Sequence, residues 1–94
     1  MDARSVIVRP IVSERSFEMI EQGRYTFEVD KRATKPQIAA AVTEIFGVTV
    51  TKVNTMNVSG KPRRLRAAKG ITRSWKKAVV SLKEGDSIEF FEGH

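Results

Sequence analysis

The segment 59–77 constrains the fold more than any other part of the sequence. It holds eight basic residues and no acidic one, while the rest of the chain holds nine basic and eleven acidic residues. The net charge of +6 is therefore concentrated in one stretch, the basic arm. A charge run is most often a solvated, disordered loop. This one lies between two strand-like segments and is closed by Trp75, which favours an arm carried between paired strands.

The composition of the arm suits a polyanionic partner. Its cations are Lys61, Arg63, Arg64, Arg66, Lys69, Arg73, Lys76 and Lys77. Each phosphate that such a side chain neutralises releases counterions, and arginine can also fork to phosphate oxygens and stack on bases. Trp75 either stacks on a base or anchors the arm on the sheet, and we favour anchoring because a lone tryptophan beside a strand usually packs. We predict that these nine residues contact nucleic acid.

Length and composition indicate one folded domain, residues 1–94. Hydrophobic residues make up 40% of the chain, which favours a folded core over disorder. The sequence contains no cysteine, and its N-terminus lacks the apolar segment of a signal peptide. No apolar run approaches the length that spans a membrane. We expect a soluble cytoplasmic protein without membrane insertion.

The N-terminal third predicts a strand followed by a short helix. Residues 5–8 form an apolar run that ends before a proline, as an edge strand can. Ser13 is a good helix N-cap, and Glu14 suits the positive end of the helix dipole. The pattern predicts Phe17 and Ile20 as the buried face of this helix.

A second strand and a longer helix follow. Residues 24–30 alternate, with Tyr25, Phe27 and Val29 on one face and polar residues on the other. Thr34 and Gln37 form a capping box at the start of the next helix. An apolar stripe on that helix predicts the main core contact of the domain. The stripe consists of Ile38, Val42, Ile45 and Phe46, and the helix ends at Gly47.

Two further strands flank the basic arm. Residues 48–58 read as a long strand in which Val53 breaks the alternation, through either a bulge or a sheet covered on both faces. Residues 78–82 form the last strand. Because these strands are consecutive, they should pair as an antiparallel hairpin whose tip extends beyond the sheet. The predicted fold is α+β, with a four-stranded antiparallel sheet packed with helices and a long basic β-hairpin extension.

Signals for catalysis are weak. The single histidine, His94, is the last residue, and no nucleophile–base pair, metal-ligand cluster or phosphate-binding glycine motif is visible. We therefore predict no enzyme activity, cofactor or metal. On residues alone, two rival classes remain, a free-standing RNA-binding regulator and a small phosphate-processing enzyme of α+β build. The enzyme would need an anion cradle and a catalytic group, which the sequence does not offer.

Several segments together resemble bacterial large-subunit ribosomal protein twenty-three. The matching segments are 9–16, 25–35, 46–48, 53–58, 75–78 and 82–86. They occur in the family's order over nearly the whole chain, and each alone would be weak. One departure is Ser74, where relatives often carry aspartate before the tryptophan.

The resemblance implies a fold and a set of partners. The family's fold is a four-stranded antiparallel sheet with helices, in agreement with the pattern above. Its members bind large-subunit ribosomal RNA beside the peptide exit tunnel, among neighbouring ribosomal proteins, and their extended hairpin reaches toward the tunnel wall. The docking site for trigger factor and the signal recognition particle includes the glutamate of a Val-Ser-Glu motif, which implies docking roles for Ser13 and Glu14. From the residues alone we would favour a plain helix-end role for Glu14; the resemblance reverses that preference.

Overall fold

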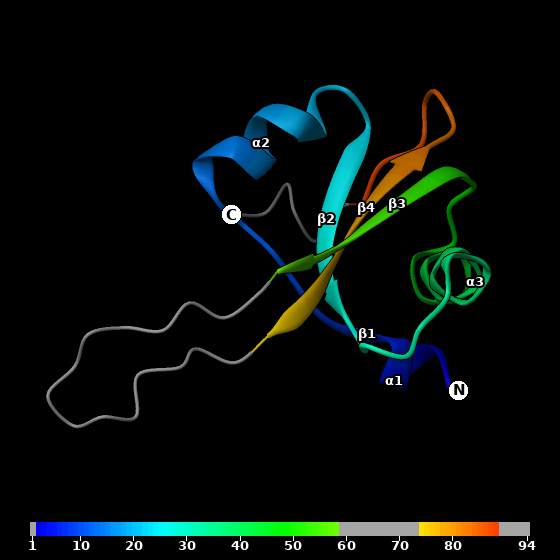
Figure 1. The fold of residues 1–94 in the computed structure, drawn as a ribbon. Coiled ribbons are helices and arrows are strands. Elements are labelled where there is room, and N and C mark those ends of the chain that lie inside the picture. The colour runs from blue at the N-terminus through cyan, green and yellow to red at the C-terminus, as the bar shows by residue number, and fades with distance from the viewer. Residues whose placement is uncertain (1, 59–73, 89–94) are drawn as a thin grey trace, which may run out of the picture.

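A computed structural model describes residues 2–58 and 74–88. The described elements alternate between helices and strands, and the last two are both strands (Figure 1). In chain order they are α1 (Ala3–Val6), β1 (Ile7–Pro10), α2 (Glu14–Ile20), β2 (Arg24–Val29), α3 (Lys35–Phe46), β3 (Val50–Val58) and β4 (Trp75–Leu82). The predicted α+β class is confirmed.

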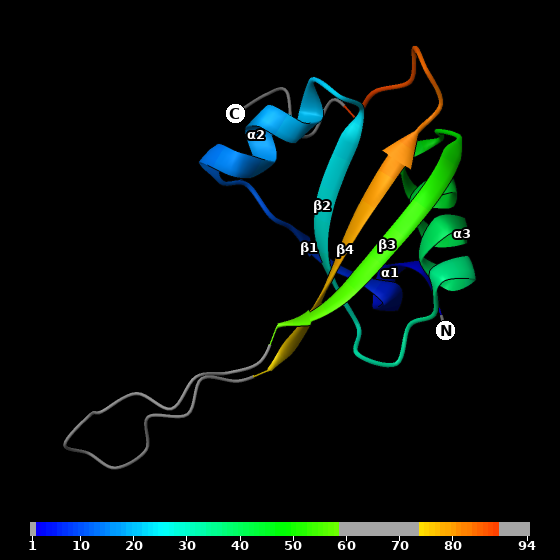
Figure 2. The ribbon, with the colours of Figure 1, turned by 45° about the horizontal axis from the view of Figure 1, so that its top comes forward.

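The four strands form one antiparallel sheet in the order β1-β2-β4-β3 (Figure 2). The predicted pairing of the last two strands is confirmed, since β3 and β4 pair from Val50 with Leu82 to Val58 with Trp75. Both strands therefore reach the basic arm at the same end of the sheet. The extension of the arm beyond the sheet falls on residues 59–73, which lie outside the described residues.

The core lies between the sheet and α3. Tyr25, Phe27 and Val29 are all at most 2% exposed, which confirms the face predicted from the alternation in β2. Ile38 and Val42 of α3 are fully buried against them, and the rings of Phe27 and Phe46 lie 5.7 Å apart. Figure 1 shows the strands between α3 on one side and α2 on the other.

The two larger helices begin as the sequence predicted. Ser13 caps α2 and Thr34 caps α3, each through a reciprocal capping box that satisfies two backbone N–H groups at once. α3 ends at Gly47, which adopts a left-handed conformation with φ of +66°. This conformation is cheap for glycine because it lacks a Cβ atom.

The N-terminal strand begins later than predicted. Residues 5 and 6 belong to the helical turn α1, where the N–H groups of Ser5 and Val6 donate to the carbonyl of Asp2. This turn buries Val6, and its residues pack on α3. The edge strand is β1, which begins two residues later. It reaches Pro10 because, among the described strands, none pairs with its outer edge, so the missing N–H costs no ladder bond.

Two predictions about buried helix faces are wrong. Phe17 is 40% exposed, because α2 rests on the sheet through Ser16 and Ile20, which lie four positions apart on one face. Ile45 is 41% exposed, because it lies beside α1, whose four residues are too few to cover it. Phe46 is half-buried, so the stripe on α3 is narrower than its four residues suggested.

The irregular alternation of β3 comes from a bulge. The pairing with β4 shifts by one residue between Val50 and Lys52. Val50 and Val53 therefore both pack against the core, although their numbers differ in parity. The strand itself begins at Val50, and Val48 is buried just before it.

Candidate nucleic-acid interface

The root of the basic arm is a paired strand. Trp75, Lys76 and Lys77 are the first three residues of β4, and each has a partner on β3. The other predicted contacts with nucleic acid lie outside the described residues; they are Lys61, Arg63, Arg64, Arg66, Lys69 and Arg73. The rigid pairing of β3 with β4 fixes where this segment leaves and rejoins the sheet.

Lys76 points to the side of the sheet that carries α3. Its Nζ donates to the backbone carbonyl of Ala33 at 2.6 Å, across 43 residues of chain. Ala33 is buried and directly precedes Thr34, the N-cap of α3. One donor of the ammonium group thus fixes the loop before α3, and two donors remain. Sequence reasoning assigned this lysine to nucleic acid and gave no sign of the internal bond.

Trp75 and Lys77 point to the opposite side, because side chains alternate along a strand. On that side Lys77 lies directly across from Glu28 of β2. Glu28 in turn accepts a hydrogen bond from Nε of Arg9 at 2.7 Å, so the pair joins β1 to β2. The Arg9 side chain is 60% exposed, which makes this ion pair a weak contributor to stability.

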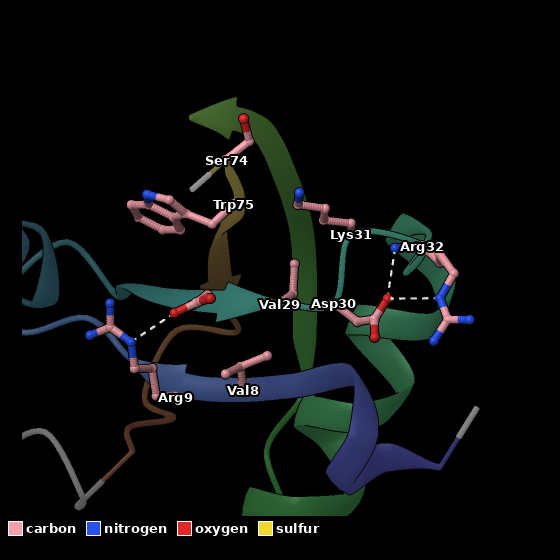
Figure 3. Close-up of a pocket in the computed structure, with 9 residues that line it drawn as sticks. Val8, Arg9, Val29, Asp30, Lys31, Arg32, Ser74 and Trp75 are labelled. Carbon is pink, nitrogen blue, oxygen red and sulfur yellow. Dashed lines mark hydrogen bonds and ion pairs between the residues drawn. The ribbon is translucent and has the colours of Figure 1, made fainter. Parts of the chain in front are cut away.

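An open groove of about 720 Å³ lies beside Trp75 (Figure 3). We call it the Trp75 groove. It collects side chains from β1, β2, the loop after β2 and the start of β4. Its lining residues are Val8, Arg9, Glu28, Val29, Asp30, Lys31, Arg32, Ser74 and Trp75. Val8, 55% exposed, contributes an apolar surface to a groove otherwise rich in charge.

The loop after β2 is held by a local charge pair. The Asp30 carboxylate accepts from the backbone N–H of Arg32 at 2.8 Å and from its Nε at 3.3 Å. The backbone hydrogen bond, helped by the guanidinium, lowers the pKa of Asp30 below its ordinary value of 3.8. Asp30 therefore stays ionised at neutral pH and keeps Arg32 at the rim of the groove.

Sequence reasoning missed most of this groove. It placed Glu28 on the polar face of β2. That Arg9 and Lys31 line the same groove depends on how the strands pair, which the sequence did not predict. The register of β1 is interrupted by a bulge between Ile7 and Arg9, which no sequence pattern marks. Arg9 and Lys31 lie far from Trp75 in the sequence, and nothing in the sequence indicated that they line the same groove.

The other predicted site lies on α2. Ser13 and Glu14 are both exposed, and the Ser13 hydroxyl accepts from the N–H of Ser16 at 3.2 Å. Glu14 is the first residue of the helix. Val12 and Phe17 flank the pair with exposed fractions of 44% and 40%. We call these exposed residues, Val12, Ser13, Glu14 and Phe17, the α2 surface.

The described part of the chain carries no sign of metal chemistry or of a membrane span. Across residues 2–58 and 74–88, no three His, Cys, Asp or Glu side chains come together in a way that would hold a metal ion. Within the same residues, each helix is too short or too polar to cross a bilayer.

Comparison with known proteins shows the family of the chain. Residues 5–90 match the model of the family described as Ribosomal protein L23. The "Large ribosomal subunit protein uL23" of Roseiflexus castenholzii is 50% identical over 93 residues, which cover 99% of each chain. The protein of the same name from Symbiobacterium thermophilum is 52% identical over 93 residues, again 99% of each chain. In Kocuria rhizophila the identity is 51% over 92 residues, which cover 98% of this chain and 90% of the relative. The chain therefore belongs to the ribosomal protein L23 family, whose members are structural ribosomal proteins rather than enzymes.

Proposed function

We propose that this protein is a structural constituent of the large ribosomal subunit, bound to the ribosome in the cytoplasm. Its basic arm binds large-subunit ribosomal RNA near the peptide exit tunnel, and its body contacts neighbouring ribosomal proteins. The α2 surface docks trigger factor and the signal recognition particle. The rival enzyme class has no support in the family, and a free-standing regulator does not fit relatives named as subunit proteins over nearly the whole chain.

The observation that carries the RNA proposal is the placement of charge. Eight of the seventeen basic residues lie in residues 59–77, and this segment joins two strand ends that are paired at Val58 and Trp75. A sheet of four strands with a buried core thus offers a fixed base for a concentrated positive charge. Contacts between cations and phosphates supply most of the sequence-independent affinity of a protein for nucleic acid. A concentrated positive charge therefore favours binding to RNA.

The RNA proposal is tested by charge removal at the arm. Replacing Arg63, Arg64 and Arg66 with alanine should weaken binding to large-subunit rRNA and leave thermal unfolding nearly unchanged. Each lost phosphate contact should reduce the slope of log K against log salt by roughly 0.7–0.9. The matched control removes three exposed cations outside the arm, Arg4, Arg24 and Lys83. An equal change of slope in both variants would reject a special role for the arm.

The docking proposal rests on the exposure of the α2 surface. Glu14 offers a charge that a cationic partner can pair, and Val12 and Phe17 offer apolar side chains that are 44% and 40% exposed. α2 stands on the opposite side of the strands from α3 (Figure 1). A partner can therefore approach it without disturbing the main core.

The docking proposal is tested on assembled ribosomes. Ribosomes that carry Glu14→Gln should assemble normally and bind labelled trigger factor up to about fivefold more weakly, the size expected for an exposed ion pair. Glu44→Gln, which neutralises an exposed carboxylate on α3, is the matched control. Equal affinities for the parent, Glu14→Gln and Phe17→Ala would leave Glu14 as a helix-end charge only.

A further inference from the structure

We propose that the Trp75 groove binds one unpaired nucleotide of the RNA, with its base stacked on the Trp75 indole and its phosphate held by the cations at the rim. This inference rests on the proposed function and extends it from the arm to a site on the body of the domain. The proposed ligand is single-stranded RNA, of which one nucleotide enters the groove. It also assigns binding to Arg9 and Lys31, which lie far from the arm in sequence.

The size and shape of the groove fit such a ligand. Its volume of about 720 Å³ lies within the range of roughly 300–1,000 Å³ that small-ligand sites occupy. Figure 3 shows the indole at one side of the groove and the Lys31 side chain at another. Trp75 is half-buried and lines the groove, so the residue is neither fully covered nor fully exposed. The anchoring role expected from the sequence and a stacking role are thus compatible.

The charges of the groove favour an anion. Among the described residues that line it, the two acidic side chains are already paired, Glu28 with Arg9 and Asp30 with Arg32. The Glu28 carboxylate accepts from Nε of Arg9, and the two terminal nitrogens of that guanidinium are not part of this hydrogen bond. These nitrogens keep donors for a phosphate or for the edge of a base. The Lys31 ammonium adds a positive charge that neither carboxylate balances.

The position of the groove favours RNA over a protein partner. Ser74 and Trp75 follow directly after the cationic segment 59–73 in the chain. A strand of RNA held by that segment would meet the indole and the rim cations next. An aromatic ring combined with cations that track a backbone is the usual composition of sites for single-stranded nucleic acid.

Trp75 provides its own probe, because it is the only tryptophan of the chain. Large-subunit rRNA, stripped of protein, is titrated into the full chain, and tryptophan emission is measured together with binding. Stacking predicts that emission falls in step with binding and that the indole becomes shielded from acrylamide. Binding with unchanged emission and unchanged shielding would overturn the groove proposal and leave the proposed function intact. Failure of rRNA to bind at all would overturn both.

Variants then separate stacking from packing. Trp75→Ala should weaken rRNA binding by about 5- to 150-fold, which corresponds to about 1–3 kcal/mol for one stacked base. Trp75→Phe keeps an aromatic ring that can pack on the sheet, so it should restore folding and part of the affinity. Ile45→Ala removes a partly exposed apolar side chain of α3 that does not line the groove, and it should leave binding unchanged. An alanine variant that folds and binds like the parent would reject stacking.

The rim cations are tested in the same assay. Arg9→Gln should weaken rRNA binding and also reduce the protection of one RNA base from chemical modification. Arg24→Gln, an exposed arginine at the far end of β2, is the matched control and should do neither. Shielding of Trp75 in assembled subunits but not with protein-free rRNA would show that a protein covers the groove, and would refute the nucleotide site.

Discussion

The helices α2 and α3 begin in the same way and serve different purposes. Both start with a capping box, at Ser13 and Thr34. α3 then buries Ile38 and Val42 completely, whereas α2 fully buries only the small Ser16, covers Ile20 in part and leaves Phe17 40% exposed. A good cap therefore says where a helix begins but not whether the fold depends on it. The helix that buries its apolar residues holds the domain together, and the one that exposes them offers a surface.

The two helices also differ in the contacts that hold the segment before each of them. The loop before α3 is tied to the sheet by Lys76, which donates to the Ala33 carbonyl, and is shaped by the Asp30–Arg32 pair. Between β1 and α2, among the described residues, the N–H of Ile11 donates to the carbonyl of Thr26. The start of the helix that carries the core is thus held by side chains as well as by backbone.

The largest expected effect is a difference in stability between two variants, each of which truncates one apolar residue on one of the two helices. Ile38→Ala should lower the free energy of unfolding by about 2–5 kcal/mol, because it leaves a cavity in the core. Phe17→Ala removes a larger side chain and should cost only about 1 kcal/mol or less, because that ring is partly in water already. Denaturant unfolding of both variants measures the difference. Similar losses would mean that α2 is as much part of the core as α3.

The sequence predicted the parts of the fold that local patterns determine. The alternation in β2, the caps at Ser13 and Thr34 and the glycine end of α3 all depend on neighbours within a few residues, and all are confirmed. The predicted burial of Phe17 and Ile45 was wrong, because burial depends on which distant element covers each residue. Helical spacing fixes the direction of a side chain and not what stands opposite it.

The same limit applies to the candidate site. Charge concentration made the basic arm visible in the sequence, and family resemblance made Ser13 and Glu14 visible. The Trp75 groove depends on the register of β1, β2 and β4, which places Arg9, Glu28 and Lys77 in one row. Lys76 and Lys77 look alike in the sequence, yet strand alternation sends one to an internal carbonyl and the other to the opposite face.

A smaller effect should separate these two neighbouring lysines. Lys76→Met should lower stability by about 1.5–3 kcal/mol, the range for hydrogen bonds with a charged partner, because the Ala33 carbonyl loses its donor. Lys77→Met, on the other face of the same strand, should leave stability within about 0.5 kcal/mol of the parent. Amide exchange at the start of α3 should rise in the first variant alone. Equal stability of the two variants would show that the bond to Ala33 does not anchor α3.

The smallest effect should appear as a pH dependence in the loop before α3. The pKa of Asp30 is lowered, chiefly by the backbone N–H of Arg32, so its ionised form is favoured in the folded state. Its contribution to stability is present above the ordinary value of 3.8 and is lost as the pH falls through the lower folded value. Asp30→Asn keeps an oxygen that can accept from Arg32 but removes the charge. The melting temperature of the parent should therefore exceed that of the variant near neutral pH, and the gap should close as the pH falls below 3.8 and through the lower folded value. Because the Arg32 side chain of the pair is 83% exposed, the gap should be small and should shrink further in high salt. A gap that stays constant down to the acid end would show that the shape of the turn, and not the charge of Asp30, stabilises the entry to α3.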